Sequence, residues 1–184
     1  MALDTRNIID RYKNDSNRLW QWTDDMIRSD LDSQAFPYAV LVENLVSDLN
    51  FSGIIRASNA FNAKEIFYIG NKKFDPRGAV GTQHYKNVTH LKAFEDLVKL
   101  KEKYTLVAVE NNIDAAVSMD KFEYTDNMLF VFGAEGVGIS SETLAICDKF
   151  IYVRTYGSVR SLNVCSCANI ILNDYATRFA SKIG

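Results

Sequence analysis

Residues 132–138 read FGAEGVG, and residues 156–164 read YGSVRSLNV. Each segment combines glycine with a few polar side chains, and each follows an apolar run. Apolar strands that end in glycine and small polar residues form the ligand pockets of α/β proteins, at the carboxyl ends of parallel strands. The two segments therefore predict an α/β fold with a ligand pocket built from the last third of the chain.

The rest of the sequence fits this fold class. Apolar runs typical of buried strands occupy residues 38–42, 65–70, 105–109, 128–132 and 150–153, and helical patterns occupy residues 54–61, 93–103, 141–147 and 162–181. Near-continuous apolar strands that alternate with helices predict a parallel sheet with helices on both faces. Residues 1–36 instead have the spacing of amphipathic helices and end before Pro37. We expect a helical extension over 1–36 and a main domain over 37–184.

Composition limits the function classes. The chain has 184 residues, 47% of them hydrophobic, and no apolar run approaches the ~20 residues of a membrane helix. The first residues lack a secretory signal pattern, and three cysteines without paired spacing suggest neither a disulfide framework nor a zinc site. With only two histidines, no metal site or catalytic triad is expected. We expect a cytoplasmic protein without a membrane partner.

A net charge of −2 disfavours nucleic-acid binding unless basic residues gather locally. The segment 71–86 is the best candidate, because it carries Lys72, Lys73, Arg77, His84 and Lys86 against the single acid Asp75. Phe74 and Tyr85 lie between these cations. The segment is either an RNA-binding loop or a solvated connector.

Three segments contain candidate site residues. Residues 50–56, NFSGIIR, place Asn50 or Ser52 at the start of a helix and Arg56 about one turn further on, where an ordinary surface ion pair is the alternative. Glu135 in the glycine turn disfavours a phosphate ligand, although a simple tight turn is the alternative. Ser161 or Asn163 can cap the last helix, and both can line a pocket. Neither a dinucleotide fingerprint nor a phosphate loop occurs, so a nucleotide-dependent oxidoreductase is disfavoured.

In this order, residues 50–56, 129–138 and 156–164 resemble the three motifs of the SpoU-type branch of the SPOUT superfamily, which are RNA ribose 2′-O-methyltransferases. The resemblance covers about residues 38–178. It implies an α/β fold with a carboxyl-terminal deep trefoil knot, a homodimer formed through the knot region, and S-adenosylmethionine as cofactor. The cofactor residues implied are Phe132, Gly133, Gly136, Ile151, Val153, Ser161 and Leu162. The catalytic residues implied are Asn50, Arg56, Glu135, Ser161 and Asn163.

The resemblance leaves the substrate and one residue role open. Transfer RNA and ribosomal RNA are both candidate substrates; transfer RNA is favoured here, because no separate RNA-binding domain precedes the core. Arg56 either acts as a base or positions the RNA, and the high pKa of a guanidinium favours positioning. Lys72, Lys73, Arg77 and Lys86 are the predicted RNA contacts. A catalytically silent RNA-binding homologue is the second hypothesis.

Overall fold

The computed structural model describes residues 23–43, 48–70, 79 and 82–183. Its helices and short 3₁₀ turns are α2 (Asp24–Ser33), α3 (Asp48–Ala60), η3 (Thr82–His84), α4 (Phe94–Leu100), η4 (Met119–Lys121), α5 (Ser141–Ile146) and α6 (Val164–Ile183). Its strands are β1 (Phe36–Glu43), β2 (Ala63–Ile69), β3 (Val88–Leu91), β4 (Thr105–Val109), β5 (Val117–Ser118), β6 (Met128–Phe132) and β7 (Lys149–Tyr152).

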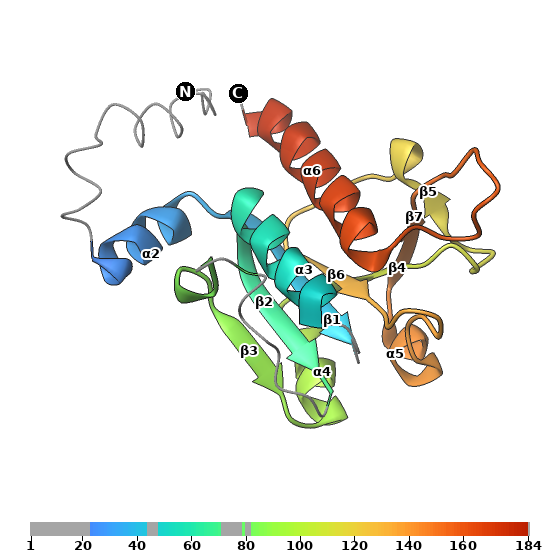
Figure 1. Ribbon diagram of the computed structural model, residues 1–184, viewed down its shortest axis with the longest axis horizontal. Helices are drawn as coiled ribbons and strands as arrows, with labels where there is room; N and C mark the ends of the chain where they lie inside the picture. The colour runs from blue at the N-terminus through green and yellow to red at the C-terminus, as the bar shows by residue number, and fades with distance from the viewer. Residues whose placement is uncertain (1–22, 44–47, 71–78, 80–81, 184) are drawn as a thin grey trace.

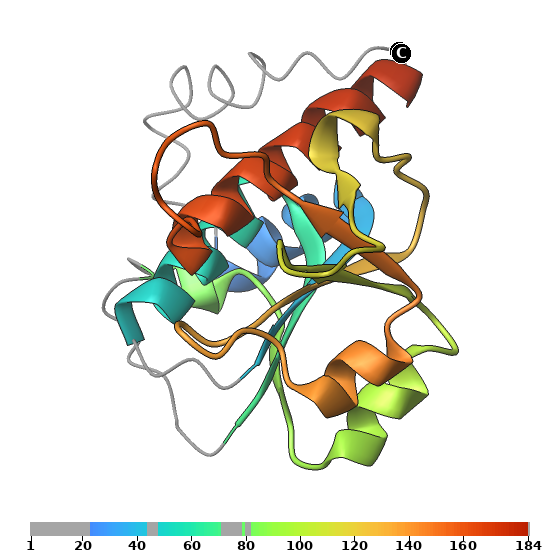
Figure 2. The same cartoon turned by 90° about the vertical axis from the view of Figure 1, so that its right-hand side faces the viewer.

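A single parallel sheet forms the centre of the molecule. Its seven strands lie in the order β3-β2-β1-β6-β4-β7-β5, and every described pair is parallel. Helices α3 and α6 lie side by side on one face, whereas α4 and α5 lie on the other (Figures 1 and 2). The predicted parallel sheet with helices on both faces is confirmed.

Alternating residues of the central strands feed two separate cores. In β1, Tyr38, Val40 and Val42 face the core beneath α3 and α6, whereas Ala39 and Leu41 face the core beneath α4 and α5. Because both faces are buried, the strand is apolar at almost every position. This double burial explains why the strands read as continuous apolar runs in the sequence.

Helix α6 is held to the sheet by aromatic packing. The ring of Tyr175 lies 4.6 Å from that of Tyr38 and 5.6 Å from that of Phe130. Its hydroxyl donates to the carbonyl of Thr125 at 3.1 Å. The side chain is fully buried, so this hydrogen bond supplies the polar partner that a buried tyrosine needs.

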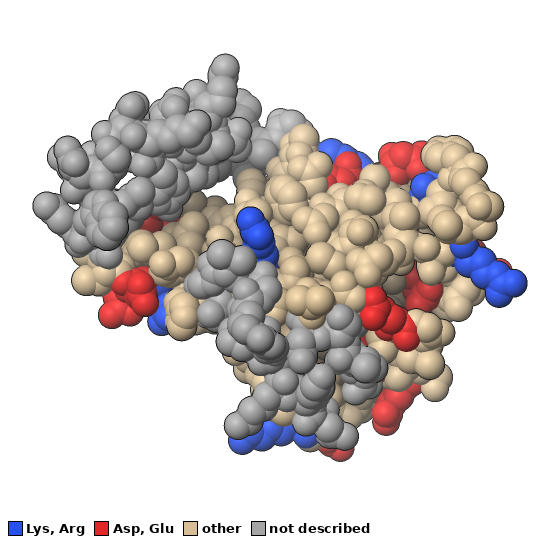
Figure 3. All heavy atoms as spheres, in the orientation of Figure 1, with Lys and Arg blue, Asp and Glu red and all other residues tan. Residues whose placement is uncertain are grey.

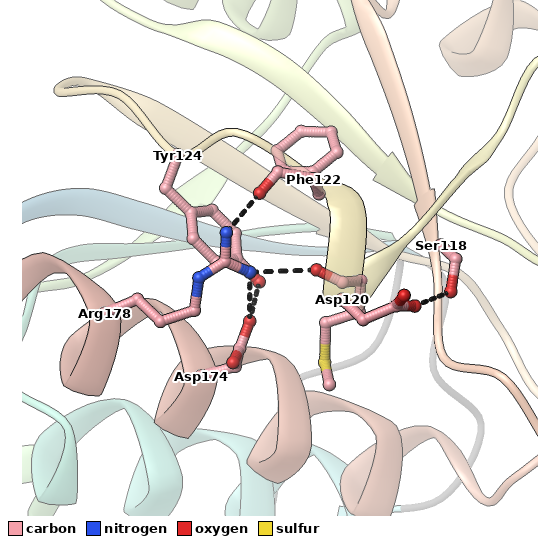
Figure 4. Close-up of polar contacts among 7 residues, drawn as sticks. Ser118, Asp120, Phe122, Tyr124, Asp174 and Arg178 are labelled. Atoms are coloured by element: carbon pink, nitrogen blue, oxygen red, sulfur yellow. Dashed lines mark hydrogen bonds and ion pairs between the residues drawn. The ribbon is translucent and has the colours of Figure 1, made fainter.

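A second contact joins α6 to the segment that follows β5. Arg178 donates to the carbonyls of Met119 at 3.0 Å and Phe122 at 2.6 Å, and it pairs with Asp174 at 3.1 Å. The guanidinium lies 4.8 Å from the ring centre of Tyr124, whose hydroxyl donates to Asp174 at 2.8 Å (Figure 4). These contacts fix the outer half of α6 against the loop between β5 and β6.

Two predicted helix starts differ from the structure, and two short elements were not predicted. Helix α3 begins at Asp48, so Asn50 lies inside its first turn and does not precede it. Helix α6 begins at Val164, which leaves Asn163 as the residue before its first turn. The short strand β5 and the turn η4 were not predicted, because two residues give no measurable strand pattern.

Helix α2 confirms helical structure in the described part of the amino-terminal region. None of its residues is buried. Two hydrogen bonds attach it to the main domain: Arg28 donates to the carbonyl of His84 at 2.6 Å, and Asn62 donates to the carbonyl of Leu31 at 3.1 Å. Residues 1–22 lie outside the described part, and the division of the chain at residue 36 stays a prediction. Within the described residues, no helix is both long and apolar enough to cross a membrane.

Candidate active site

A cavity of about 960 Å³ opens at the carboxyl ends of β4, β6 and β7. Its wall consists of residues that follow each of these strands, together with the start of α6. The carboxyl edge of a parallel sheet is where α/β proteins bind ligands. Both glycine-rich segments quoted from the sequence therefore lie on one cavity, as their pattern predicts.

The glycine turn forms one side of this cavity. The backbone groups of Ala134 and Gly138 pair in both directions, at 3.0 and 2.8 Å. At Gly133 an added Cβ would come within 2.2 Å of the backbone of Gly138 and Ile139, and Gly138 itself has a φ of +73°. The narrow turn therefore depends on glycine at both ends, and its residues line the cavity.

Buried polar contacts attach the far end of the turn to the sheet. Glu43, which is 5% exposed at the end of β1, accepts hydrogen bonds from the backbone and hydroxyl of Ser140, at 3.0 and 2.6 Å. Thr143 donates to the same carboxylate at 3.1 Å. Ser140 also caps α5 by accepting from the Thr143 backbone at 3.2 Å. This carboxylate thus fixes the position at which the glycine turn enters α5.

Three polar residues from the three motifs meet at the rim of the cavity. The side-chain amide of Asn163 donates to Asn50 Oδ1 and to Glu135 Oε1, both at 3.1 Å. Asn50 donates to the same oxygen of Glu135. Segments that lie far apart in the sequence therefore form one hydrogen-bonded cluster, which we call the rim cluster: Asn50, Glu135 and Asn163.

Asn163 also starts α6. Its Oδ1 accepts from the backbone of Cys165 at 3.0 Å and of Ser166 at 3.2 Å, as a helix-capping side chain does. One amide therefore satisfies the end of the helix with its oxygen and holds the rim cluster with its nitrogen. Asn163 therefore caps α6 and also lines the cavity.

The seven residues predicted to bind the cofactor are divided between the cavity wall and the core. Six of the seven line the cavity: Phe132, Gly133, Gly136, Val153, Ser161 and Leu162. Ile151 does not line it, because its side chain is fully buried in the core beneath α6. Ile151 instead supports the cavity through its carbonyl, which accepts from the backbone of Glu110 at 3.0 Å.

Arg56 is exposed on α3 and does not line the cavity. It lies six residues beyond Asn50, about 9 Å further along the helix. Gly53, one turn before Arg56, faces Cys165 of α6 so closely that an added Cβ would lie 2.5 Å from Sγ. Arg56 therefore lies at an exposed position of α3, about two turns along the helix from Asn50 of the rim cluster and outside the cavity wall.

The predicted RNA contact Lys86 is a correction. It is 3% exposed, and its ammonium donates to Asn62 Oδ1 at 2.5 Å. Burial lowers its pKa to about 8, while Asp32 acts in the opposite direction. An ammonium that is buried in this way is not accessible to a phosphate of a bound RNA. Lys72, Lys73 and Arg77 lie outside the described residues.

Charges of both signs are interspersed over the described residues on the face drawn in Figure 3. Among the described side chains, no group of three His, Cys, Asp or Glu could hold a metal ion.

Three polar residues that follow β4 line the cavity and were not predicted from the sequence: Glu110, Asn111 and Asn112. The sequence pattern could have predicted them, because they directly follow the apolar run 105–109, and polar residues at the carboxyl end of a parallel strand often line a ligand pocket.

The sequence model of the SpoU rRNA Methylase family matches residues 37–173. That match covers all three motifs and most of the chain. The chain belongs to the SpoU rRNA methylase family. Family membership agrees with the positions of the three motifs around one cavity.

Two relatives of the chain have the same name. A tRNA (guanosine(18)-2′-O)-methyltransferase of Thermus thermophilus is 32% identical over an alignment of 143 positions, and the alignment covers 72% of this chain and 71% of the relative. The Escherichia coli enzyme of the same name is 28% identical over an alignment of 137 positions, and the alignment covers 72% of this chain and 60% of the relative.

Solved structures of the family share the fold. A tRNA modifying enzyme, TrmH/SpoU of A. aeolicus, superposes with a TM-score of 0.77 at 24% identity, over 86% of this chain and 83% of that chain. The SpoU methyltransferase AviRb of Streptomyces viridochromogenes, solved in complex with AdoMet, superposes with a TM-score of 0.71 at 23% identity, over 78% of this chain and 58% of that chain.

Proposed function

We propose that this protein transfers a methyl group from S-adenosylmethionine to a ribose 2′-hydroxyl of RNA, and that the RNA is a transfer RNA. The rim cluster carries the proposal, because it joins the polar residues of all three family motifs at the mouth of one cavity. The names of the curated relatives support transfer RNA as the substrate class.

The residues present fit the cofactor. When bound, S-adenosylmethionine supplies a methyl group on a positively charged sulfonium. The cavity, at about 960 Å³, is of the size that holds such a ligand, and its wall combines apolar side chains with backbone left open by glycine. The residues that we assign to cofactor binding are Phe132, Gly133, Gly136, Val153, Ser161 and Leu162.

The rim cluster and Arg56 are assigned to the RNA. Glu135 accepts two amide hydrogen bonds, which hold its carboxylate in place and leave the turn rigid at the cavity mouth. Arg56, exposed on the helix α3 that also carries Asn50, is assigned to bind a phosphate and to orient the ribose through charge-assisted hydrogen bonds. The 2′-hydroxyl loses its proton in the transfer, and Ser161, exposed on the cavity wall, is assigned to pass it to water.

RNA affinity is assigned to the basic residues of the segment after β2. Lys72, Lys73 and Arg77 remain in this proposal, and Lys86 is removed from it because it is buried. Phosphate contacts release counterions, so each of them contributes to the salt dependence of binding. Neutralising the three residues together should weaken RNA binding and reduce its salt slope, whereas an unchanged slope would exclude the segment.

We further propose a trefoil knot at the carboxyl-terminal end, a homodimer formed through this region, and a cytoplasmic location. The knot and the dimer are supported by membership of the family that the sequence motifs indicate. Cys147, Cys165 and Cys167 are free thiols, as is usual in a reducing compartment. Sedimentation equilibrium of the full chain tests the dimer: a mass of one chain at all concentrations would contradict it.

One experiment tests the activity. The purified protein is incubated with S-adenosylmethionine carrying a labelled methyl group, in parallel with total transfer RNA and with ribosomal RNA. Label should enter transfer RNA and should survive alkaline hydrolysis as a dinucleotide, because a methylated 2′-oxygen blocks cleavage. Label in ribosomal RNA alone would change the substrate class. Absence of label from both pools would favour a catalytically silent RNA-binding homologue.

A further inference from the structure

Glu110 lies at the point where the two glycine-rich segments approach the end of β4. Its side chain lines the cavity, and its backbone N–H donates to the carbonyl of Ile151 in the neighbouring strand at 3.0 Å. A Cβ added to Gly138 would come within 2.6 Å of Glu110 Oε2. The carboxylate therefore occupies the space next to the glycine turn, from which a Cβ at position 138 would displace it.

The neighbouring residue holds the opposite wall. Asn111 donates from its side chain to the carbonyl of Arg160 at 2.7 Å, and its backbone N–H donates to Glu110 Oε1 at 3.0 Å. The first contact fixes the segment 156–163 to the end of β4. The second orients the carboxylate of Glu110, so its position between the two walls is set by the backbone.

The ionised side chains of the cavity wall leave an excess of negative charge. Two carboxylates, Glu110 and Glu135, line the cavity together with one guanidinium, that of Arg160. Glu135 already accepts two amide hydrogen bonds in the rim cluster, whereas Glu110 accepts only the backbone N–H of Asn111 among the described residues. Of the two carboxylates, Glu110 therefore accepts fewer hydrogen bonds from the described residues of the protein.

The charge of Glu110 acts within the cavity. Cys167 lines the same wall from α6, and its pKa is raised to about 11, mainly by burial and further by the negative charge of Glu110. A ligand in the cavity meets the same field. A fixed anion in a partly enclosed site favours a cationic ligand over a neutral one of the same shape.

We infer that Glu110 makes the cavity selective for a cationic methyl donor over its neutral thioether product. The inference rests on the proposed function, since it assigns a role to Glu110 in the proposed donor site. The donor carries one positive charge more than S-adenosylhomocysteine, and the two molecules otherwise share every group except the methyl. Selectivity of this kind favours release of the product and its exchange for fresh donor.

Calorimetric titration of the full chain tests the inference with three ligands. S-adenosylmethionine and sinefungin, which has an ammonium in place of the sulfonium, carry the extra charge, and S-adenosylhomocysteine does not. E110Q keeps the size of the side chain and removes its charge. We expect it to weaken binding of both cationic ligands about tenfold, which is ~1.4 kcal/mol, and to leave the neutral product nearly unaffected. D114N is the matched control, because Asp114 is exposed and lies outside the cavity wall.

The other outcomes overturn the inference. Equal weakening of all three ligands would place Glu110 beside a group that they share, such as the ribose, and would contradict charge selection. Unchanged binding of all three to E110Q would remove Glu110 from the site. If the wild-type protein binds none of them, the proposed function itself fails. A thermal unfolding curve of E110Q that matches the wild type excludes misfolding as the cause of weaker binding.

Discussion

The side-chain nitrogen of Asn163 lies 3.1 Å from Glu135 Oε1, and this contact joins the start of α6 to the glycine turn after β6. The same side chain caps α6 through its oxygen. The helix cap and the contact with the proposed site residue Glu135 therefore depend on opposite ends of one amide. A substitution that preserves one end and not the other can separate them.

N163D and N163A should have different effects. Aspartate caps a helix as well as asparagine does, but it cannot donate to Glu135 and adds a like charge beside it. We expect N163D to retain most of the stability and to lose methyl transfer. N163A removes the cap as well, and its free energy of unfolding should fall by ~1 kcal/mol. Urea unfolding and a methylation assay on both variants measure the two effects. Equal stability of N163A and the wild type would contradict the capping role.

Arg56 should be needed for turnover and not for cofactor binding. Since it is exposed and does not line the cavity, R56A should bind S-adenosylmethionine as the wild type does. Loss of a group that stabilises developing charge typically lowers kcat by about 10²-fold or more. R56K should not restore it, because an ammonium lacks the planar fork of a guanidinium. K64A, at another exposed cation of the described surface, is the control. Turnover of R56A close to wild type would make the assignment wrong.

The strands were predictable because their environment is uniform. A strand such as β6, whose five residues are all buried, has the same apolar character at every position. The order of the strands was not predictable in this way. β1 pairs with β2 on one side and with β6, far along the chain, on the other, and no local pattern encodes that choice.

The side chains at the site also differ in whether a local sequence pattern could predict them. Asn50, Glu135 and Asn163 were predicted because they lie inside motifs with a fixed spacing. Glu110 lies in none of the motifs. Its proposed role depends on the turn at Gly138, which the fold brings next to the Glu110 carboxylate. Lys86 was assigned to a surface by its charge, although the fold buries it beside Asn62. Burial of a single charged residue is a tertiary property, which composition does not contain.

Two glycines of the turn should respond differently to alanine. At Gly133 the added Cβ would lie 2.2 Å from backbone atoms, which cannot move aside as a side chain can. We expect G133A to lower the free energy of unfolding by about 3 kcal/mol and to weaken cofactor binding strongly. At Gly136 no atom lies within 4 Å of the added Cβ, and only the φ of +84° opposes it. G136A should therefore lower stability by about 1 kcal/mol.

Thermal unfolding and calorimetric titration of the two variants provide the comparison. Each variant adds the same methyl group to the same turn, so the pair controls for composition. Similar losses in both would mean that the turn rearranges freely, and the proposed cofactor wall at Gly133 would then lack its structural basis.

Lys86 should make the stability of the protein rise with pH. Burial lowers its pKa to about 8 from the ordinary value of 10.5. Below pH 8 the side chain is protonated in both the folded and the unfolded chain. Between about pH 8 and 10.5 the unfolded chain binds a proton that the folded chain does not, so the free energy of unfolding increases with pH. The increase contributed by this one group is about 3 kcal/mol at most.

Urea unfolding of the wild type, K86M and K64M at several pH values between 7 and 10.5 isolates this effect. All other titrating groups are common to the three proteins and cancel in the differences between them. The wild type should gain stability relative to K86M as the pH rises, whereas K64M, which removes an exposed lysine, should follow the wild type. A constant difference between the wild type and K86M across this range would show that Lys86 titrates as a solvated lysine does. That result would indicate that Lys86 is exposed to solvent, as the sequence-based prediction of an RNA contact requires.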